Sequence, residues 1–332
     1  MDIALDCLGG DLAPKACVEG LKYALSKEGG LHIVAFGPKK EIEEGLGELS
    51  PRVEIVDTSV AVLNTDHPST FFKEKPDSSL ALAFERLRGD EKCAALVSAG
   101  PTGALLSGGI LRIGRIPEVS RPALMATLPT RTGGMVKVMD AGANMDCKSE
   151  YILQFAIMAS TYLESIGMEK PRIGLLNVGS EEGKGNELSK EAYALLKESG
   201  LNFVGSIEGD HVLKGEADAV ICDGFAGNVF LKGTEEACYF ISDLFKEAIF
   251  KNALTKMGAL LQAKGLRNVK KPFDYAKKAC APLLGIKKLV LKCHGKSSAE
   301  TFGETIIEAK RLYDADMIGK VQSRIAEKEG QK

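Results

Sequence analysis

The sequence predicts a three-layer α/β/α sandwich built on a mainly parallel β-sheet, with a protruding helical arm. Apolar β-type segments alternate with helical segments along most of the chain, which is the order of elements in a doubly wound α/β fold. Several of the β-type segments are apolar without alternation, as strands covered on both faces are. Glycine-rich polar turns follow many of them. We find no low-complexity linker and no internal repeat, and expect one domain over 1–332, including a basic amphipathic arm at about 240–280.

The individual elements follow from composition and periodicity. The expected strands are apolar runs that end in turn residues, at 3–8, 32–37, 53–57, 94–100, 123–129, 135–142, 172–179, 202–207, 218–224 and 288–295. The expected helices have apolar residues at helical spacing, at 14–27, 78–88, 102–114, 149–166, 187–199, 225–250 and 298–325. The first of these helices opens with Pro14, which fits a first helical turn.

The bulk composition is that of a soluble globular protein, with 45% hydrophobic and 27% charged residues. No run approaches the roughly 18 apolar residues that a membrane-spanning helix needs. The eight cysteines are scattered singly and form no C-x-x-C pair, so neither a zinc site nor a redox pair is indicated. These features favour a cytoplasmic protein with reduced thiols.

The charge is distributed unevenly along the chain. Residues 251–292 hold eleven Lys or Arg and a single acid, Asp274, although the whole chain has a net charge of −2. A concentrated basic segment on an acidic body predicts one anionic partner surface, such as an acidic protein or a membrane. Nucleic acid is disfavoured because the rest of the chain is acidic, with no Trp and seven Tyr.

Six glycine-rich turns close predicted strands, and most of them open a helix. They span 6–11, 98–103, 140–144, 177–186, 223–228 and 294–298. Ligands of open α/β sheets collect beyond the carboxyl ends of the strands, where helix N-termini offer unpaired N–H groups. The turns therefore predict a shared rim that suits a phosphate group.

The turn with the sequence GSEEGKGNEL resembles a nucleotide-binding P-loop but lacks its spacing. A P-loop places four residues between its first Gly and the Gly-Lys pair, followed by Ser or Thr. Here three residues separate Gly179 from Gly183, and Gly185 follows Lys184. This spacing excludes a P-loop and leaves a site for free phosphate or a simple glycine-rich turn.

At this rim the sequence becomes similar to a known family. The segments DCLGGDLAPK, SAGPTGAL, RPAL, DAGAN, GLLNVGSEEGKGNEL, DGFAGNVFLK, APLLG and HGKSS resemble, in order, the motifs of bacterial phosphate acyltransferases. The resemblance covers residues 2 to 325. It implies a fold of the isocitrate dehydrogenase and phosphotransacylase type, a homodimer, and transfer of a long-chain acyl group from acyl-[acyl-carrier-protein] to inorganic phosphate. The chain departs from the family pattern at Leu12 and Pro101, where His and Asn are usual.

Such a reaction demands little of the protein. Phosphate is already an oxyanion, so the site must position it, stabilise the tetrahedral oxyanion and release the thiolate, without a metal or a cofactor. The resemblance makes Lys184 the first candidate for contact with phosphate or oxyanion. Asn228 is either a substrate donor or a helix N-cap. His294 either protonates the leaving thiolate or hydrogen-bonds the backbone.

The remaining candidates line the predicted rim. Four residues after the first strand are expected either to form one wall of the site or to make only a tight turn: Asp6, Gly9, Gly10 and Asp11. Asp140 and Asp223 organise loops or touch substrate, and Asn144 and Asn186 are donors or caps. The expected substrate- or phosphate-binding residues are Gly9, Gly10, Asp11, Ser98, Thr102, Asp140, Asn144, Asn186, Asp223 and Gly227.

The basic arm suggests a second, non-catalytic role. Its apolar residues recur at helical spacing with lysines beside them, which is typical of an interfacial helix, although such a stripe also forms core or dimer contacts. The resemblance implies peripheral contact with an anionic membrane, and the same basic residues suit the acidic carrier protein. The expected arm residues are Leu254, Met257, Leu261, Lys264, Arg267, Lys270 and Lys271.

Three other functions compete with this interpretation. A short-chain phosphotransacylase would use acyl-CoA in place of the carrier protein. A nicotinamide-dependent decarboxylating dehydrogenase shares the expected fold, but the chain has no persuasive dinucleotide fingerprint. A membrane-docked scaffold for lipid-synthesis proteins would need no turnover at all.

Overall fold

A computed structural model of the chain describes residues 1–262, 265 and 280–329. Its strands form an 11-stranded sheet in the order β3-β2-β1-β4-β11-β10-β5-β6-β9-β7-β8. They are β1 (Asp2–Asp6), β2 (His32–Gly37), β3 (Val53–Asp57), β4 (Cys93–Ser98), β5 (Ala123–Pro129), β6 (Met135–Met139), β7 (Ile173–Asn177), β8 (Phe203–Glu208), β9 (Ala219–Ile221), β10 (Ala281–Leu284) and β11 (Leu289–Lys292).

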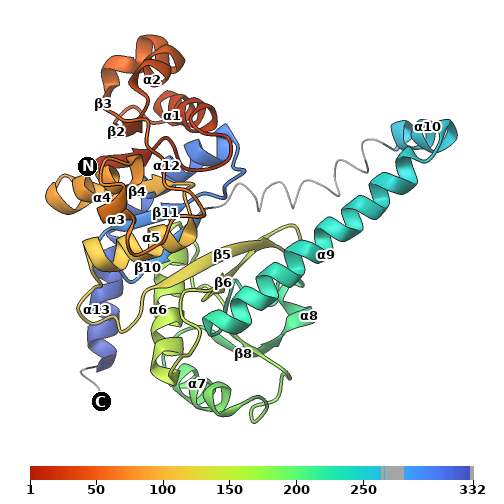
Figure 1. Ribbon diagram of the computed structural model, residues 1–332. Helices are drawn as coiled ribbons and strands as arrows, with labels where there is room; N and C mark the ends of the chain where they lie inside the picture. Colours follow the sequence, from red (N-terminus) through yellow and green to blue (C-terminus); the bar gives the residue numbers. More distant parts are fainter. Residues whose placement is uncertain (263–264, 266–279, 330–332) are drawn as a thin grey trace.

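Helices lie on both faces of this sheet, as predicted (Figure 1). They are α1 (Lys15–Lys27), α2 (Lys39–Leu46), α3 (Phe71–Glu74), α4 (Ser79–Gly89), α5 (Thr102–Gly108), α6 (Ser149–Ser165), α7 (Glu187–Lys197), α8 (Gly209–Val212), α9 (Gly224–Phe250), α10 (Ala253–Leu261), α12 (Ala299–Asp314) and α13 (Met317–Glu329), with a 3₁₀ turn η1 (Gly47–Arg52) and a π turn η2 (Gly109–Ile113).

The sheet consists of two parallel sets that run in opposite directions. β3, β2, β1, β4 and β11 are mutually parallel, and so are β6, β9, β7 and β8. Between the sets, β10 pairs antiparallel with β11 and β5, and β5 pairs antiparallel with β6. The predicted mainly parallel sheet is confirmed, but the predicted single rim of strand ends is divided in two by this reversal.

Alternation along the strands separates the core into layers. Ile3 and Leu5 of β1 pack in a cluster with α1, α6, α7, α12 and α13, whereas Ala4 between them faces α3, α4 and α5. On the second parallel set, Val136, Val138 and Val220 pack with α8 and the start of α9. The strands are therefore covered on both faces, which explains their continuous apolar sequences.

Several elements differ from the sequence prediction, and the short helices α2, α3 and α8 were not predicted. β10 was not predicted, because a four-residue segment that contains Pro282 gives too short a pattern. The single helix predicted over 298–325 is wrong: the chain breaks between α12 and α13 at Asp316, whose φ is 49°. The helix predicted at 102–114 is also modified, since it continues from α5 as the π turn η2.

The predicted arm is α9 with α10 at its tip (Figure 1). α9 begins at the sheet and has 27 residues, so it is about 40 Å long at 1.5 Å per residue. Beyond its first turns most of its residues are exposed. Asn252 caps α10 through a reciprocal capping box with Thr255. None of the described helices combines the length and the apolarity that crossing a bilayer requires.

Close contact between α1 and α12 yields a stability prediction. A Cβ at Gly20 would overlap the Cβ of Phe302 and lie 2.6 Å from the carbonyl oxygen of Ala299. We expect Gly20→Ala to lower the free energy of unfolding by about 2–3 kcal/mol, since the helices would have to separate. Urea denaturation measures this loss. Gly89→Ala is the matched control, because a Cβ there meets nothing within 4 Å, and an equal loss in the control would contradict the packing explanation.

Candidate active site

The first cluster of predicted residues lies at the ends of β1, β4 and β11 and is organised by Asp6. The buried Asp6 carboxylate accepts hydrogen bonds from Ser79 Oγ and Ser98 Oγ, both at 2.6 Å, and from the amides of Leu8 and Gly9, both at 3.2 Å. Burial raises the pKa of Asp6, and these donors oppose the rise. Ser98 is thus held on Asp6 and accepts the amide of Gly100 at 2.9 Å.

The glycines of the loop after β1 allow neighbouring backbone segments of the protein to approach each other closely. A Cβ on Gly9 would lie 2.6 Å from Asp6 Oδ2 and 2.6 Å from the amide nitrogen of Gly100. Gly10 has a φ of 95°, which disfavours any side chain. The exposed Asp11 donates its amide to the carbonyl of Gly295 at 2.7 Å. The loop that follows β1 is therefore joined to the loop that follows β11.

His294 and Lys292 stand at the end of β11 in this first cluster. The Nδ1 of His294 accepts the amide of Lys296 at 3.2 Å. Partial burial lowers the pKa of His294, and the positive charges of Lys292 and Lys232 lower it further. Lys292 is partly buried, and its Nζ donates to the carbonyl of Cys293 at 3.1 Å. Burial is also the main reason that the pKa of Lys292 is lowered.

The second cluster lies at the end of β6 and is organised by Asp140. This fully buried carboxylate accepts the amides of Leu124, Gly142, Ala143 and Asn144 at 2.7–3.2 Å. It also accepts Asn144 Nδ2 at 2.8 Å, while the same Nδ2 donates to the carbonyl of Pro122. Burial raises the pKa of Asp140, and its donors oppose the rise. Asp140 and Asn144 therefore shape the loop through their own hydrogen bonds.

The start of α9 packs directly on the Asp140 loop. Asp223 caps α9 by accepting the amide of Ala226 at 2.7 Å. A Cβ on Gly227 would overlap the carbonyl oxygen of Asp140, so only glycine allows this approach. The partly buried Asn228 lies beside Gly142, where a Cβ would be 3.3 Å from the Cβ of Asn228. Asn228 thus stands at the surface of the second cluster, and the N-cap role belongs to Asp223.

The loop with Lys184 follows β7, the strand beside β9. Asn177 holds it, because its Nδ2 donates to the carbonyl of Lys184 and to Ser206 Oγ, both at 3.1 Å. The Lys184 side chain is exposed. Asn186 caps α7 by accepting the amide and the hydroxyl of Ser189 at 2.9 and 2.8 Å. Among the described residues, no hydrogen bond or ion pair joins Lys184 or Asn186 to either cluster.

A small cavity of about 20 Å³ connects the two clusters. Thr102 and Lys292 line it from the first parallel set, and Gly142 and Ala143 line it from the Asp140 loop. α9 makes a second connection, since it begins in the second cluster and its Lys232 and Glu235 act electrostatically on both Lys292 and His294. The structure therefore joins the two sets of strand ends around this cavity, which is the candidate active site.

Most of the predicted site residues fall in these clusters. The first contains Gly9, Gly10, Asp11, Ser98 and His294; the second contains Asp140, Asn144, Asp223, Gly227 and Asn228; and Thr102 lies between them. Sequence analysis did not single out Lys292 or Ser79. The available signal for Lys292 was a lysine at the end of the otherwise apolar strand KLVLK.

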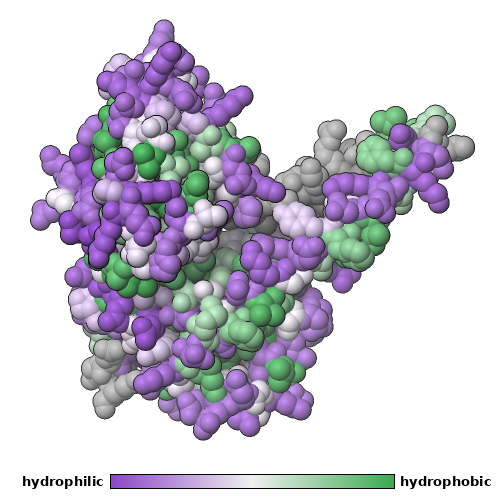
Figure 2. Space-filling view, in the orientation of Figure 1, coloured by the Kyte–Doolittle hydropathy of each residue, from purple (hydrophilic) through white to green (hydrophobic). Residues whose placement is uncertain are grey.

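The predicted arm residues are only partly described. Met257 and Leu261 are 61% and 86% exposed on α10, where Figure 2 shows hydrophobic residues at the tip of the arm. The backbone of Leu254 belongs to the same helix. Lys264, Arg267, Lys270 and Lys271 lie outside the described residues.

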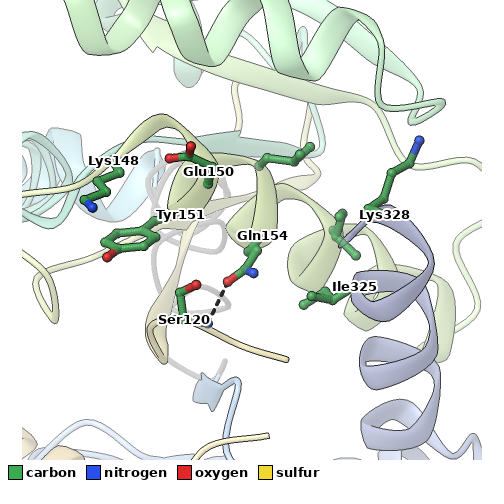
Figure 3. Close-up of a pocket in the computed structure, with 9 residues that line it drawn as sticks. Ser120, Lys148, Glu150, Tyr151, Gln154, Ile325 and Lys328 are labelled. Atoms are coloured by element: carbon green, nitrogen blue, oxygen red, sulfur yellow. Dashed lines mark hydrogen bonds between the residues drawn. The ribbon is translucent and has the colours of Figure 1, made fainter. Parts of the chain in front are cut away.

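A larger cavity of about 320 Å³ lies elsewhere, between the start of α6 and α13 (Figure 3). Ser120 and Gln154 meet there, with the Ser120 amide donating to Gln154 Oε1 at 2.8 Å. Lys148, Tyr151 and Lys328 also line it. None of the predicted site residues does, so cavity size alone does not identify the active site.

Comparisons with known proteins bear on the fold and on the family. Among solved structures, a phosphotransacetylase from Streptococcus pyogenes is similar with a TM-score of 0.58 and 16% identity over 94% of both chains. A branched-chain phosphotransacylase from Enterococcus faecalis V583 has a TM-score of 0.56 and 12% identity over 94% of this chain and 98% of its own. These likenesses establish a shared fold.

Sequence relatives establish the family. Residues 1–320 match the family model described as "Fatty acid synthesis protein". Phosphate acyltransferases from Thermoanaerobacterium thermosaccharolyticum and Clostridium acetobutylicum are 42% and 40% identical, over 98% of this chain and 97% and 99% of theirs. The chain therefore belongs to the bacterial phosphate acyltransferase family and is an enzyme that transfers an acyl group to phosphate.

Proposed function

We propose that the protein transfers a long-chain fatty acyl group from acyl-[acyl-carrier-protein] to inorganic phosphate, giving acyl phosphate for phospholipid synthesis. A phosphate oxygen attacks the thioester carbonyl, the tetrahedral oxyanion collapses, and the carrier thiolate leaves. The observation that carries the proposal is the pair of loop clusters that meet around one cavity lined by Lys292, in a chain of this family. The loop amides are held by Asp6 and Asp140, so the positioned donors that such a transfer needs are side chains and cations carried on these loops.

Individual roles follow from the positions of the side chains. Lys184 contacts phosphate or the oxyanion from a loop whose Gly183 and Gly185 allow close approach. Asn228 donates from the start of α9, since Asp223 already caps that helix. His294 has a lowered pKa and accepts a hydrogen bond at Nδ1, so its neutral form carries the proton on Nε2 and donates from there.

The proposed acyl donor, the carrier protein, is supported by the basic segment and by the arm. Residues 251–292 carry eleven basic residues against one acid, which suits an acidic carrier protein. The end of α9 and α10 present exposed apolar side chains in or next to this segment, including Phe250, Met257 and Leu261. A long acyl chain and its membrane-bound products are compatible with a protein that contacts an anionic bilayer peripherally.

We propose further that two copies pair along α9. A projecting helix needs tertiary packing for its stability, yet Phe240 and Leu244 are 62% and 50% exposed. Ile241 and Phe245, one helical turn apart, are 52% and 61% exposed. A second copy of the same helix would cover this surface. Sedimentation equilibrium at the mass of one chain would contradict the pairing.

The donor can be tested directly. Purified protein incubated with phosphate and either long-chain acyl-[acyl-carrier-protein] or acetyl-CoA should release free carrier thiol only with the first donor. Thiol release and acyl phosphate are both measurable. Turnover with acetyl-CoA alone would instead support a short-chain phosphotransacylase, and absence of turnover with either donor would support the scaffold alternative.

Lys184→Ala tests the proposed charged contact. Because loss of one oxyanion-stabilising donor costs on the order of 100-fold in turnover, we expect at least that decrease in kcat/KM with an unchanged melting temperature. Lys190→Ala is the matched control, an exposed lysine six residues along the same segment. Full activity in the Lys184 variant would remove this residue from the proposed mechanism.

The arm can be tested separately from the chemistry. Met257→Glu combined with Leu261→Glu places two charges on the exposed face of α10, and we expect it to release the protein from anionic vesicles while turnover on soluble substrate persists. Vesicle co-sedimentation measures binding. Leu63→Glu, at an exposed apolar position away from the arm, should leave binding intact. Unchanged binding by the double variant would refute membrane contact through α10.

A further inference from the structure

Three lysines in or next to the sheet are buried or partly buried. Two of them have clear hydrogen-bond partners within the fold. Lys137 of β6 is buried, donates to Thr127 Oγ1 at 2.8 Å, and lies 5.1 Å from the centre of the Tyr162 ring. Lys288, directly before β11, donates to the carbonyls of Asp90 and Cys93 at 2.9 and 2.5 Å. Both ammonium groups are satisfied within the fold.

Lys292, at the other end of β11, is different. Within the described residues its Nζ has one acceptor, the carbonyl of Cys293, and no carboxylate within ion-pair distance. The acid that acts on it is Glu235, which is itself paired with Lys232 at 3.2 Å. A partly buried ammonium with so little compensation favours the approach of an anion.

The surroundings of Lys292 indicate what that anion is. Lys292 lines the small cavity between the two clusters together with Thr102, Gly142 and Ala143, and the rest of the lining is apolar, from Leu105, Leu106, Leu124, Leu283 and Val290. The positive charge of Lys232 lowers the pKa of Lys292 further. Other charged or titratable groups that act on Lys292 or its neighbour His294 are Cys293, Glu235 and Asp11. A compact anion bound at the lysine end of this cavity would compensate the positive charge.

We infer that Lys292 is a substrate-binding residue whose ammonium group holds the inorganic phosphate beside the small cavity between the two clusters. This inference rests on acyl transfer to phosphate as the reaction, but not on the identity of the acyl donor. The phosphate charge supplies the counter-ion that Lys292 does not find among the described residues.

Lys292→Met tests this assignment, with Lys292→Gln as a second variant that retains a polar end. We expect the KM for phosphate to rise by at least ten-fold while the KM for the acyl donor stays close to that of the unmodified protein. Without phosphate, the melting temperature of Lys292→Met should be equal or higher, because an uncompensated buried charge has been removed. A purely structural lysine would lower it.

Phosphate binding is also measured without any acyl donor, so the result does not depend on the donor proposal. Increasing phosphate at constant ionic strength should raise the melting temperature of the unmodified protein by ligand linkage, and the two Lys292 variants should lose this rise. Lys288→Met is the matched control. It should lose stability, since two carbonyls lose their donor, yet retain the phosphate-dependent rise and the phosphate KM.

The outcomes separate the two proposals. If both Lys292 variants keep the phosphate KM and the phosphate-dependent rise in melting temperature, the assignment of Lys292 is overturned. If they lose both while the unmodified protein rejects long-chain acyl-[acyl-carrier-protein], Lys292 remains the phosphate ligand and only the donor proposal fails.

Discussion

The architecture of the site depends on two buried carboxylates that replace water as partners for loop amides. Asp6 is the last residue of β1 and Asp140 directly follows β6, and each accepts amide hydrogen bonds from the residues that come next. Buried amides must be paired, and a carboxylate can pair several at once. The two loops are consequently held in conformations in which a glycine lies directly against another backbone segment, as at Gly9 and Gly227. The side chains that touch substrate can then be few.

The reversal of strand direction at β10 and β5 explains why the site lies where it does. In a wholly parallel sheet all strand ends would meet along one edge. Here the ends of β1, β4 and β11 belong to one set and those of β6, β7 and β9 to the other. α9 and the cavity around Lys292 bring the two sets together. A reaction between two substrates can therefore take place between two loop clusters that are each rigid.

Much of this arrangement could be predicted from the sequence because its signals are local. Long apolar runs identified most strands, and the glycine-rich turns identified both clusters. The break at Asp316 could not be predicted, since no glycine or proline marks that positive φ. Lys292 was missed for another reason. Its importance depends on burial and on the absence of a nearby carboxylate within the described residues, which are properties of the assembled sheet.

The position of β10 and β11 in the sheet has a consequence for how the protein is made. These strands are formed by residues 281–292, yet they lie between β4 and β5, at the centre of the strand order. While the ribosome synthesises the chain, everything up to the arm emerges before the centre of the sheet exists. Until then, the edge of β4 that will pair with β11 and the edge of β5 that will pair with β10 are unpaired. Such edges favour association with other chains. Completion of the sheet is therefore a late, long-range step, and the finished enzyme no longer presents these two edges.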